Sequence, residues 1–322
     1  MKPIVQVAAL AIGVVIAPVT APAADAPLWK QTTPLALKIP LILNHDGVTV
    51  RLAPVTRHVA ATGPDEEEHD ETLAEITVTY AGQPGYVVPT DEARLDVHGV
   101  AVGVGRLSPR DARPVVILEG YSGGAHCCGT FQLVALTAAG PVTRTLPMID
   151  GGPGNRFPRD IDGDGVRDIV RQDDSLRYVF ASGAGSWSPP TVFNLVAGEL
   201  ADVTAAPRYA PMWQRYAAET WRACAKRRDF ETNGACAAYG AAMARLGRGD
   251  EGLDAAVRVA KWPAMFQPEL CQVTVPDDEP CPAGQEQYFT TFRGALRWYL
   301  GVTGYLPAMT PAPSELSGRA AD

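Results

Sequence analysis

Four aspartates at alternate positions of one short stretch have the clearest chemical capacity in this chain. Asp160, Asp162, Asp164 and Asp168 lie in the run Asp-Ile-Asp-Gly-Asp-Gly-Val-Arg-Asp. Alternate residues of a tight loop can direct their side chains at one centre, and the glycines permit sharp backbone reversals. Calcium takes roughly six to eight oxygen ligands at about 2.3–2.6 Å. The four carboxylates, the carbonyl of Val166 and a water supply that set, so the sequence predicts a calcium site.

The residues after this loop distinguish between known kinds of calcium loop. An EF-hand needs a bidentate acid at the twelfth loop position, and Arg171 stands there. EF-hand loops also lie between helices, whereas Ile169 begins a predicted strand. The stretch 160–170 closely resembles the calcium loop of FG-GAP (integrin-alpha-like, VCBS-type) repeats, over about residues 155–195. The resemblance implies a structural calcium ion held between two strands of a blade by the four aspartates and the Val166 carbonyl.

A second stretch with chemical capacity is Ser-Gly-Gly-Ala-His-Cys-Cys, which ends at Cys128. It is similar to a segment of uncharacterised exported bacterial proteins. His126 and the thiolates of Cys127 and Cys128 are donors that zinc and copper accept. Adjacent cysteines in an oxidising compartment favour a vicinal disulfide instead. We expect a disulfide-stiffened turn with Ser122 and His126 as a candidate binding surface, and a metal or redox role stays open.

Arrangements typical of catalysis are weak. Ser122 lies four residues before His126, but no acid is placed in the sequence to orient the histidine as a catalytic base. Carboxylate pairs for glycoside hydrolysis could be drawn from Glu119, Asp150 or Asp173 and Asp174. Nothing in the sequence favours one pair, so we assign no catalytic residue.

The N-terminus predicts export. Lys2 precedes an apolar run over 4–19, and Ala21-Pro22-Ala23 matches a small-residue cleavage site. We therefore expect a signal peptide over residues 1–23, cleaved near Ala23. The apolar run is short for a membrane span, and we expect no span once the signal is removed. The mature protein is expected in the periplasm or outside the cell.

Six cysteines in an exported protein favour disulfides. Cys224 and Cys236 flank a predicted helix–turn–helix corner at Asn233-Gly234, and Cys271 and Cys281 flank a loop rich in proline and aspartate. We expect these two pairs, with Cys127–Cys128 as the third. The net charge of −8 and the lack of a basic stripe interleaved with aromatics argue against nucleic acid as a partner.

The pattern of apolar residues divides the chain into two parts. Short strand signals follow one another over 27–204, and the series ends with Tyr178-Val179-Phe180 and Val192-Phe193, which favours an all-β domain. Helical spacing then recurs between 205 and 306, including a predicted helix over 285–300. We expect a disordered tail over 307–322. The fold class is α+β and multi-domain: blade-like antiparallel sheets with one calcium loop, then a small disulfide-bonded helical domain.

These features favour an exported, non-catalytic, calcium-stabilised binding or interaction protein. Its partner would be a protein, a glycan or an envelope component. The alternative is a hydrolase acting on cell-envelope or extracellular polymers. A third hypothesis is a metal or redox protein that uses His126, Cys127 and Cys128.

Overall fold

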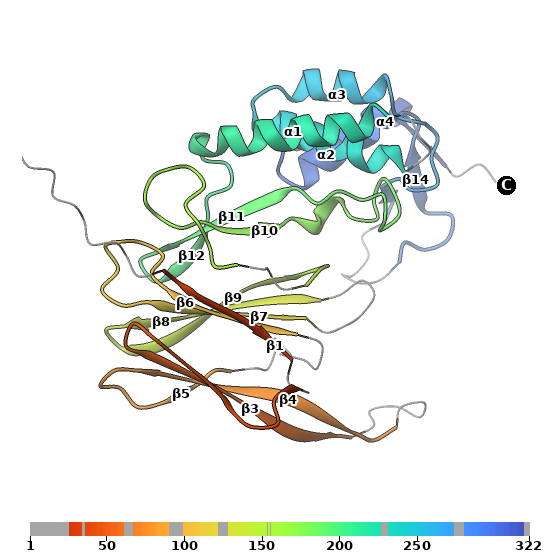
Figure 1. Cartoon of the computed structure of the whole chain (residues 1–322). Coiled ribbons are helices and arrows are strands. Elements are labelled where there is room, and N and C mark those ends of the chain that lie inside the picture. Colours follow the sequence, from red (N-terminus) through yellow and green to blue (C-terminus); the bar gives the residue numbers. More distant parts are fainter. Residues whose placement is uncertain are drawn as a thin grey trace, which may run out of the picture.

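A computed structural model describes most of the chain. The described residues are 26–33, 36–60, 67–89, 99–121, 128–152, 154, 156–226, 231–273 and 280–318. The expected signal peptide lies outside them. Within the described ranges, three antiparallel β-sheets and a helical region lie one above another (Figure 1).

The first layer is a four-stranded sheet in the order β2-β3-β4-β5. Its strands are β2 (Leu41–His45), β3 (Val48–Val59), β4 (His69–Tyr80) and β5 (Tyr86–Val87). Residues at alternate positions, such as Val50 and Leu52, are fully buried in a core shared with the next sheet. This alternation is typical of a sheet with one face buried.

The second layer is a five-stranded sheet in the order β1-β6-β7-β8-β9. Its strands are β1 (Leu28–Thr32), β6 (Val100–Gly105), β7 (Val115–Tyr121), β8 (Gly129–Thr137) and β9 (Gly140–Ile149). Val116 and Leu118 contact the core below this sheet, whereas Ile117 and Leu133 belong to a separate core on its other face. Burial of both faces explains why β7 is a continuous apolar run rather than an alternating one.

The third layer is a three-stranded sheet of β10 (Ile169–Gln172), β11 (Pro190–Val196) and β12 (Glu199–Asp202). Ile169 and Phe193 pack toward the five-stranded sheet. Val192 instead belongs to the core formed with the helices. The sheet therefore lies between the β layers and the helical region, as Figure 1 shows.

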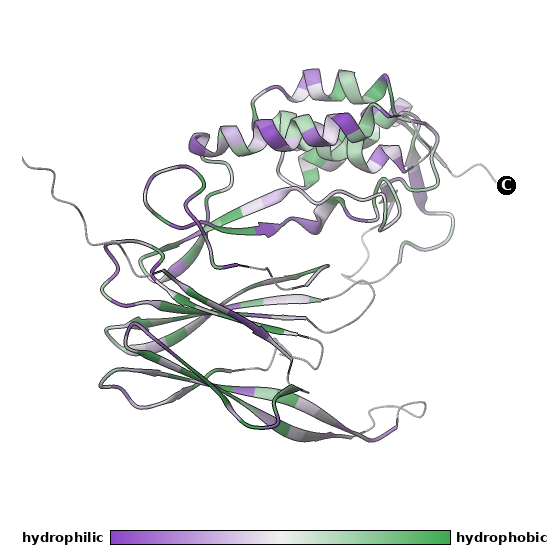
Figure 2. Cartoon of the chain, viewed as in Figure 1, coloured by the Kyte–Doolittle hydropathy of each residue, from purple (hydrophilic) through white to green (hydrophobic). Residues whose placement is uncertain are grey.

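The helical region follows the short 3-10 helix η3 (Pro207–Tyr209). Its helices are α1 (Ala210–Cys224), α2 (Thr232–Arg245), α3 (Gly249–Val257) and α4 (Phe292–Val302). A small sheet joins them, made of β13 (Glu269–Cys271), β14 (Glu286–Phe289) and β15 (Leu316–Gly318). Figure 2 shows the apolar α2 among the helices and the more hydrophilic α1 beside it.

The core of the helical region extends across position 204, where the sequence places the end of the β domain. Phe180 and Val192 are fully buried in the same cluster as Trp213 and Leu296. The ring of Phe180 packs edge-on against the ring of Phe292, with 5.6 Å between their centroids. The helices are thus packed on β11 and on the segment between β10 and β11.

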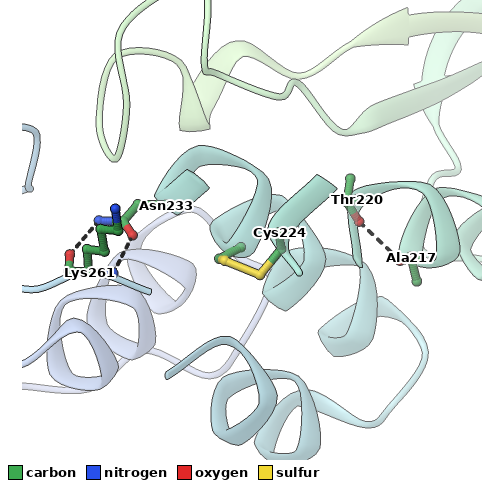
Figure 3. Close-up of a disulfide and its surroundings, with 6 residues drawn as sticks. Ala217, Thr220, Cys224, Asn233 and Lys261 are labelled. Carbon is green, nitrogen blue, oxygen red and sulfur yellow. Dashed lines mark hydrogen bonds between the residues drawn. A yellow bond between two sulfur atoms is a disulfide. The ribbon is translucent and has the colours of Figure 1, made fainter. Parts of the chain in front are cut away.

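Two disulfides lie in the helical region, between Cys224 and Cys236 and between Cys271 and Cys281. The first joins the end of α1 to α2 (Figure 3). Asn233 is not in a corner as expected, but in the first turn of α2, where its side chain exchanges hydrogen bonds with the backbone N–H and C=O of Lys261 at 2.9 and 2.8 Å.

The coarse prediction, antiparallel sheets followed by a small disulfide-bonded helical region, is confirmed. The predicted helix over 285–300 is wrong in its first part, because β14 pairs with β13 and β15 before α4 begins. The predicted strand at Tyr178 is also wrong, since that residue has a positive φ of 62° in a turn. Where the sequence predicts a disordered tail, residues 316–318 form β15.

Candidate functional site

The aspartate loop lies where the third sheet begins, close to the start of the helical region. Arg159 and Asp168 form an isolated antiparallel bridge that closes the loop, and β10 starts at the next residue. Gly163 and Gly165 have φ values of 87° and 85°. Residues with a side chain rarely adopt this left-handed conformation, so glycine is needed at both bends.

Backbone N–H groups of the loop donate hydrogen bonds to all four carboxylates. Each aspartate accepts at least one such hydrogen bond. Asp160 accepts from the N–H groups of Gly163 and Gly165, and Asp162 accepts from that of Asp164. Asp164 accepts from the N–H of Val166, and Asp168 from that of Ile161. The distances lie between 2.7 and 3.0 Å. Burial tends to raise the pKa of Asp160, but its bonds from Gly163 and Gly165 outweigh burial and lower that pKa.

Three of the predicted ligands converge. One carboxylate oxygen from each of Asp160, Asp162 and Asp168 lies within 4.8 Å of the others. Asp164 is not part of this group, and its Oδ2 lies 4.0 Å from Nε of Arg208. The Val166 carbonyl stays a predicted ligand.

Asp162 is the most informative member of the group. Its side chain is only 1% exposed, and its Oδ2 lies 2.6 Å from Nε of Arg208. That contact is close enough for an ion pair, yet no donor in the described part of the chain is aligned to form a hydrogen bond to this oxygen. Burial, together with the neighbouring carboxylates of Asp168 and Asp164, raises the pKa of Asp162. A buried carboxylate oxygen of this kind fits a hard cation, and so does the all-oxygen donor set.

A hydrogen-bond network behind the loop connects it to η3 and β11. Oδ1 of Asp168, a residue 2% exposed, accepts bonds from the Tyr209 hydroxyl at 2.6 Å and from Nδ2 of Asn194 at 2.9 Å. Nη2 of Arg208 donates to Oδ1 of Asn194 at 3.0 Å, and the guanidinium lies over the Tyr209 ring. The sequence reasoning missed these three partners. A polar Asn194 within the apolar run 192–196 was the one available signal, because buried amides require partners.

A cleft of about 450 Å³ opens beside the loop, between β10, the segment before the loop and α1. Asp168 and Ile161 of the loop form part of its wall. Glu119 and Tyr216 line this cleft and also an adjoining hollow of about 350 Å³. Cavities of this size accommodate small organic ligands.

Glu119 forms a buried ion pair with Arg171 at the cleft. Their side chains are 10% and 5% exposed, and the closest charged atoms are 3.6 Å apart. Burial raises the pKa of Glu119, although the Arg171 guanidinium and the N–H of Gly154, which donates to its Oε2, act in the opposite direction. The Arg171 guanidinium lies over the ring of Phe131.

The other carboxylates considered for hydrolysis are engaged in contacts of their own. Asp150 pairs with Arg177 at 2.6 Å, and Asp173 accepts a 2.6 Å hydrogen bond from the Tyr305 hydroxyl. The second predicted site is the stretch that ends at Cys128, and its residues Ser122, His126 and Cys127 lie outside the described residues. Cys128 is disulfide-bonded, and its pairing with Cys127 stays a prediction.

Comparisons with known proteins give one family and two relatives. The family model of the sll0997 C-terminal domain matches residues 213–304. The chain is 28% identical over 206 residues to the probable thylakoid lumen protein sll0997 of Synechocystis, a match that covers 63% of this chain. It is 28% identical over 215 residues to the uncharacterised protein y4bJ of Sinorhizobium fredii, over 64% of this chain. The matches span 59% and 32% of these relatives, less than two thirds of either.

No solved structure shows a significant match to the chain. Among the described residues, the helices are all too short or too polar to cross a membrane.

Proposed function

We propose that the protein is an exported, calcium-stabilised binding protein without catalytic activity. Calcium would bind the aspartate loop, and a ligand or partner would bind at the cleft beside it. The observation that carries the proposal is the position of the Asp162 Oδ2 atom. It is buried beside the carboxylates of Asp160 and Asp168, and none of the described residues places an aligned hydrogen-bond donor on it. A cation would neutralise the repulsion among these groups.

Export is supported by several features taken together. Two disulfides lie in the helical region, and structural disulfides persist in oxidising compartments. A relative with 28% identity is named as a probable thylakoid lumen protein. The apolar run near the N-terminus has the composition of a secretory signal.

The position of the loop supports a structural role for calcium. Asp168 is hydrogen-bonded to Tyr209 of η3 and to Asn194 of β11. An ion held by Asp160, Asp162 and Asp168 would therefore stabilise the third sheet and the start of the helical region together. The resemblance of the loop to FG-GAP repeats also favours calcium over other cations.

Thermal unfolding of the mature protein in calcium and in a chelator tests the proposal. We expect calcium to raise the melting temperature, because a ligand at 100 times its Kd stabilises the folded state by about 2.7 kcal/mol. The double variant Asp162→Ala, Asp164→Ala should lose this response.

The matched control is Asp250→Ala with Asp254→Ala, which removes the same charge from side chains that are 87% and 59% exposed. This variant should keep the calcium response. A wild-type protein whose melting temperature does not change with calcium would contradict the proposal.

A hydrolase is the second candidate, and one observation favours it. Glu119 lines the cleft, and its raised pKa is a property of general acids. Incubation with envelope polysaccharides and peptidoglycan, followed by detection of new reducing ends, tests this candidate. Turnover by the wild type that is lost in Glu119→Gln would replace the binding proposal with an enzyme.

A further inference from the structure

We propose that the cleft beside the aspartate loop binds a small organic anion, in which a carboxylate, sulfonate or phosphate group is attached to an apolar body. This inference rests on the proposed function, since it takes the cleft as the binding site of the protein. It adds the chemical class of the ligand, which follows from the charges and the apolar surface of the cleft.

Three arginines give the cleft its charge. Arg156, Arg159 and Arg215 all line it, and all three are exposed. Within the described part of the chain, none of them has a carboxylate partner within ion-pair distance. Arginines in this state are free to form bidentate hydrogen bonds with an acid.

The acidic residues of the cleft do not cancel this charge. Glu119 is already paired with Arg171, and the charge of Asp168 would be offset by the calcium ion of the proposed function, because Asp168 is one of the three converging carboxylates. Glu219 is the remaining acid in the lining. With the calcium ion in place, three arginines would face Glu219 alone, which gives the cleft a local positive charge on a protein whose formal net charge is −8, and such a patch attracts anions.

Apolar side chains supply a surface for the body of the ligand. Phe157, Ile161 and Met212 line the cleft together with Val170, which is 44% exposed although it lies in a β-strand. Burial of apolar ligand surface here contributes roughly 25 cal/mol per Å². A simple inorganic anion would leave this surface in water, so the lining favours an amphiphilic acid.

Tyr216 provides a hydroxyl donor at the junction of the cleft and the adjoining hollow. Its Oη atom has no hydrogen-bond partner among the residues that the structure describes, and burial raises the pKa of Tyr216, so the hydroxyl keeps its proton. An unpaired buried hydroxyl is costly, and an acceptor on the ligand would satisfy it.

Two fluorescent probes test the inference in the full mature chain with calcium present. 8-Anilinonaphthalene-1-sulfonate has an acidic group on an aromatic body, and N-phenyl-1-naphthylamine is its neutral analogue. We expect the sulfonate to bind at one site per chain, and the double variant Arg159→Gln, Arg215→Gln to weaken its binding by about tenfold. The neutral probe should bind both proteins equally.

The control variant Arg110→Gln, Arg113→Gln removes the same charge from exposed residues outside the cleft, and it should bind the sulfonate within about twofold of wild type. The inference is overturned if the sulfonate does not bind to the wild type, or if both double variants lose the same affinity for the sulfonate. It is also overturned if Arg159→Gln, Arg215→Gln loses the same affinity for the neutral probe as for the sulfonate. A calcium-dependent rise in melting temperature, measured on the same samples, keeps the proposed function intact in any of these cases.

Discussion

The hydroxyl of Tyr209 donates a 2.6 Å hydrogen bond to Oδ1 of Asp168, and this bond joins η3 to the aspartate loop. The two residues are 1% and 2% exposed. Burial and the neighbouring Asp168 carboxylate both raise the pKa of Tyr209, which therefore donates across the physiological pH range. The loop and the start of α1 are thus held in one arrangement, and a change at either is expected to affect the other.

Tyr209→Phe removes this bond while keeping the buried ring. We expect the free energy of unfolding in calcium to fall by about 1–3 kcal/mol, because a buried carboxylate loses a donor. Urea denaturation measures this change. Tyr288→Phe is the control, since its hydroxyl makes an exposed 3.3 Å bond to Glu269, and its effect should stay within about 0.5 kcal/mol. Equal effects of the two variants would show that the bond to Asp168 contributes little.

Arg208→Gln removes the cation that lies 2.6 Å from Asp162. Arg208 is 43% exposed, and exposed ion pairs contribute about 0–1 kcal/mol. Calcium must compete with this guanidinium for Asp162, so we expect the variant to bind calcium up to about fivefold more tightly. Isothermal titration calorimetry measures the affinity, with Arg110→Gln as the control. Weaker calcium binding by Arg208→Gln would mean that the arginine supports the site rather than competing with the ion.

Glu119→Gln tests the consequence of the raised pKa at the cleft. Because burial raises the pKa of Glu119 above its ordinary 4.5, the folded protein holds this proton to a higher pH than the unfolded chain does. The corresponding stabilisation is present below pH 4.5 and is lost as the pH rises through the folded-state pKa.

Glutamine mimics the protonated carboxyl at every pH. We therefore expect the variant and wild type to be equally stable below pH 4.5, and the variant to become the more stable as the pH rises. Urea denaturation across a pH series measures the difference in the free energy of unfolding between the variant and wild type. The loop aspartates titrate in both proteins, so their contribution cancels in this difference. If the stability of the wild type instead increases relative to that of the variant as the pH rises, the pairing of Glu119 with Arg171 outweighs burial.

The aspartate loop could be predicted because its information is local. The four aspartates and both glycines with positive φ lie within nine consecutive residues, and the strand follows directly. The residues that complete its surroundings come from other elements. Asn194 lies in β11 and Tyr209 in η3, and the contact of each with Asp168 depends on the packing of whole layers, which a single sequence does not display.

The cleft was beyond sequence reasoning for the same reason. Glu119 lies in β7, Val170 in β10 and Tyr216 in α1, so the cleft exists only once three layers are assembled. The misplaced helix over 285–300 has a different cause. Phe289 and Phe292 are both buried at a helical spacing, although they lie on either side of a strand end. Thr291, whose Oγ1 accepts the N–H of Gly294, is the N-cap that marked the true start of α4.

Gly234→Ala tests the packing of α2 against the segment between β10 and β11. Alanine ordinarily stabilises a helix interior relative to glycine by about 1 kcal/mol. At this position, however, a Cβ would lie 2.3 Å from the carbonyl oxygen of Gly185 and 2.9 Å from Cβ of Ala181. The backbone of Gly185 cannot move aside as a flexible side chain would, so we expect a loss of about 1–3 kcal/mol in the free energy of unfolding.

Gly240→Ala is the matched control, because it makes the same change in the same helix. Its nearest neighbour would be the end of the Leu296 side chain at 3.1 Å, which can shift by a rotation. We expect this variant to lie within about 1 kcal/mol of wild type, as measured by urea denaturation. If Gly234→Ala proves as stable as Gly240→Ala, α2 can move away from Gly185 without loss, and the close contact between these segments does not stabilise the fold.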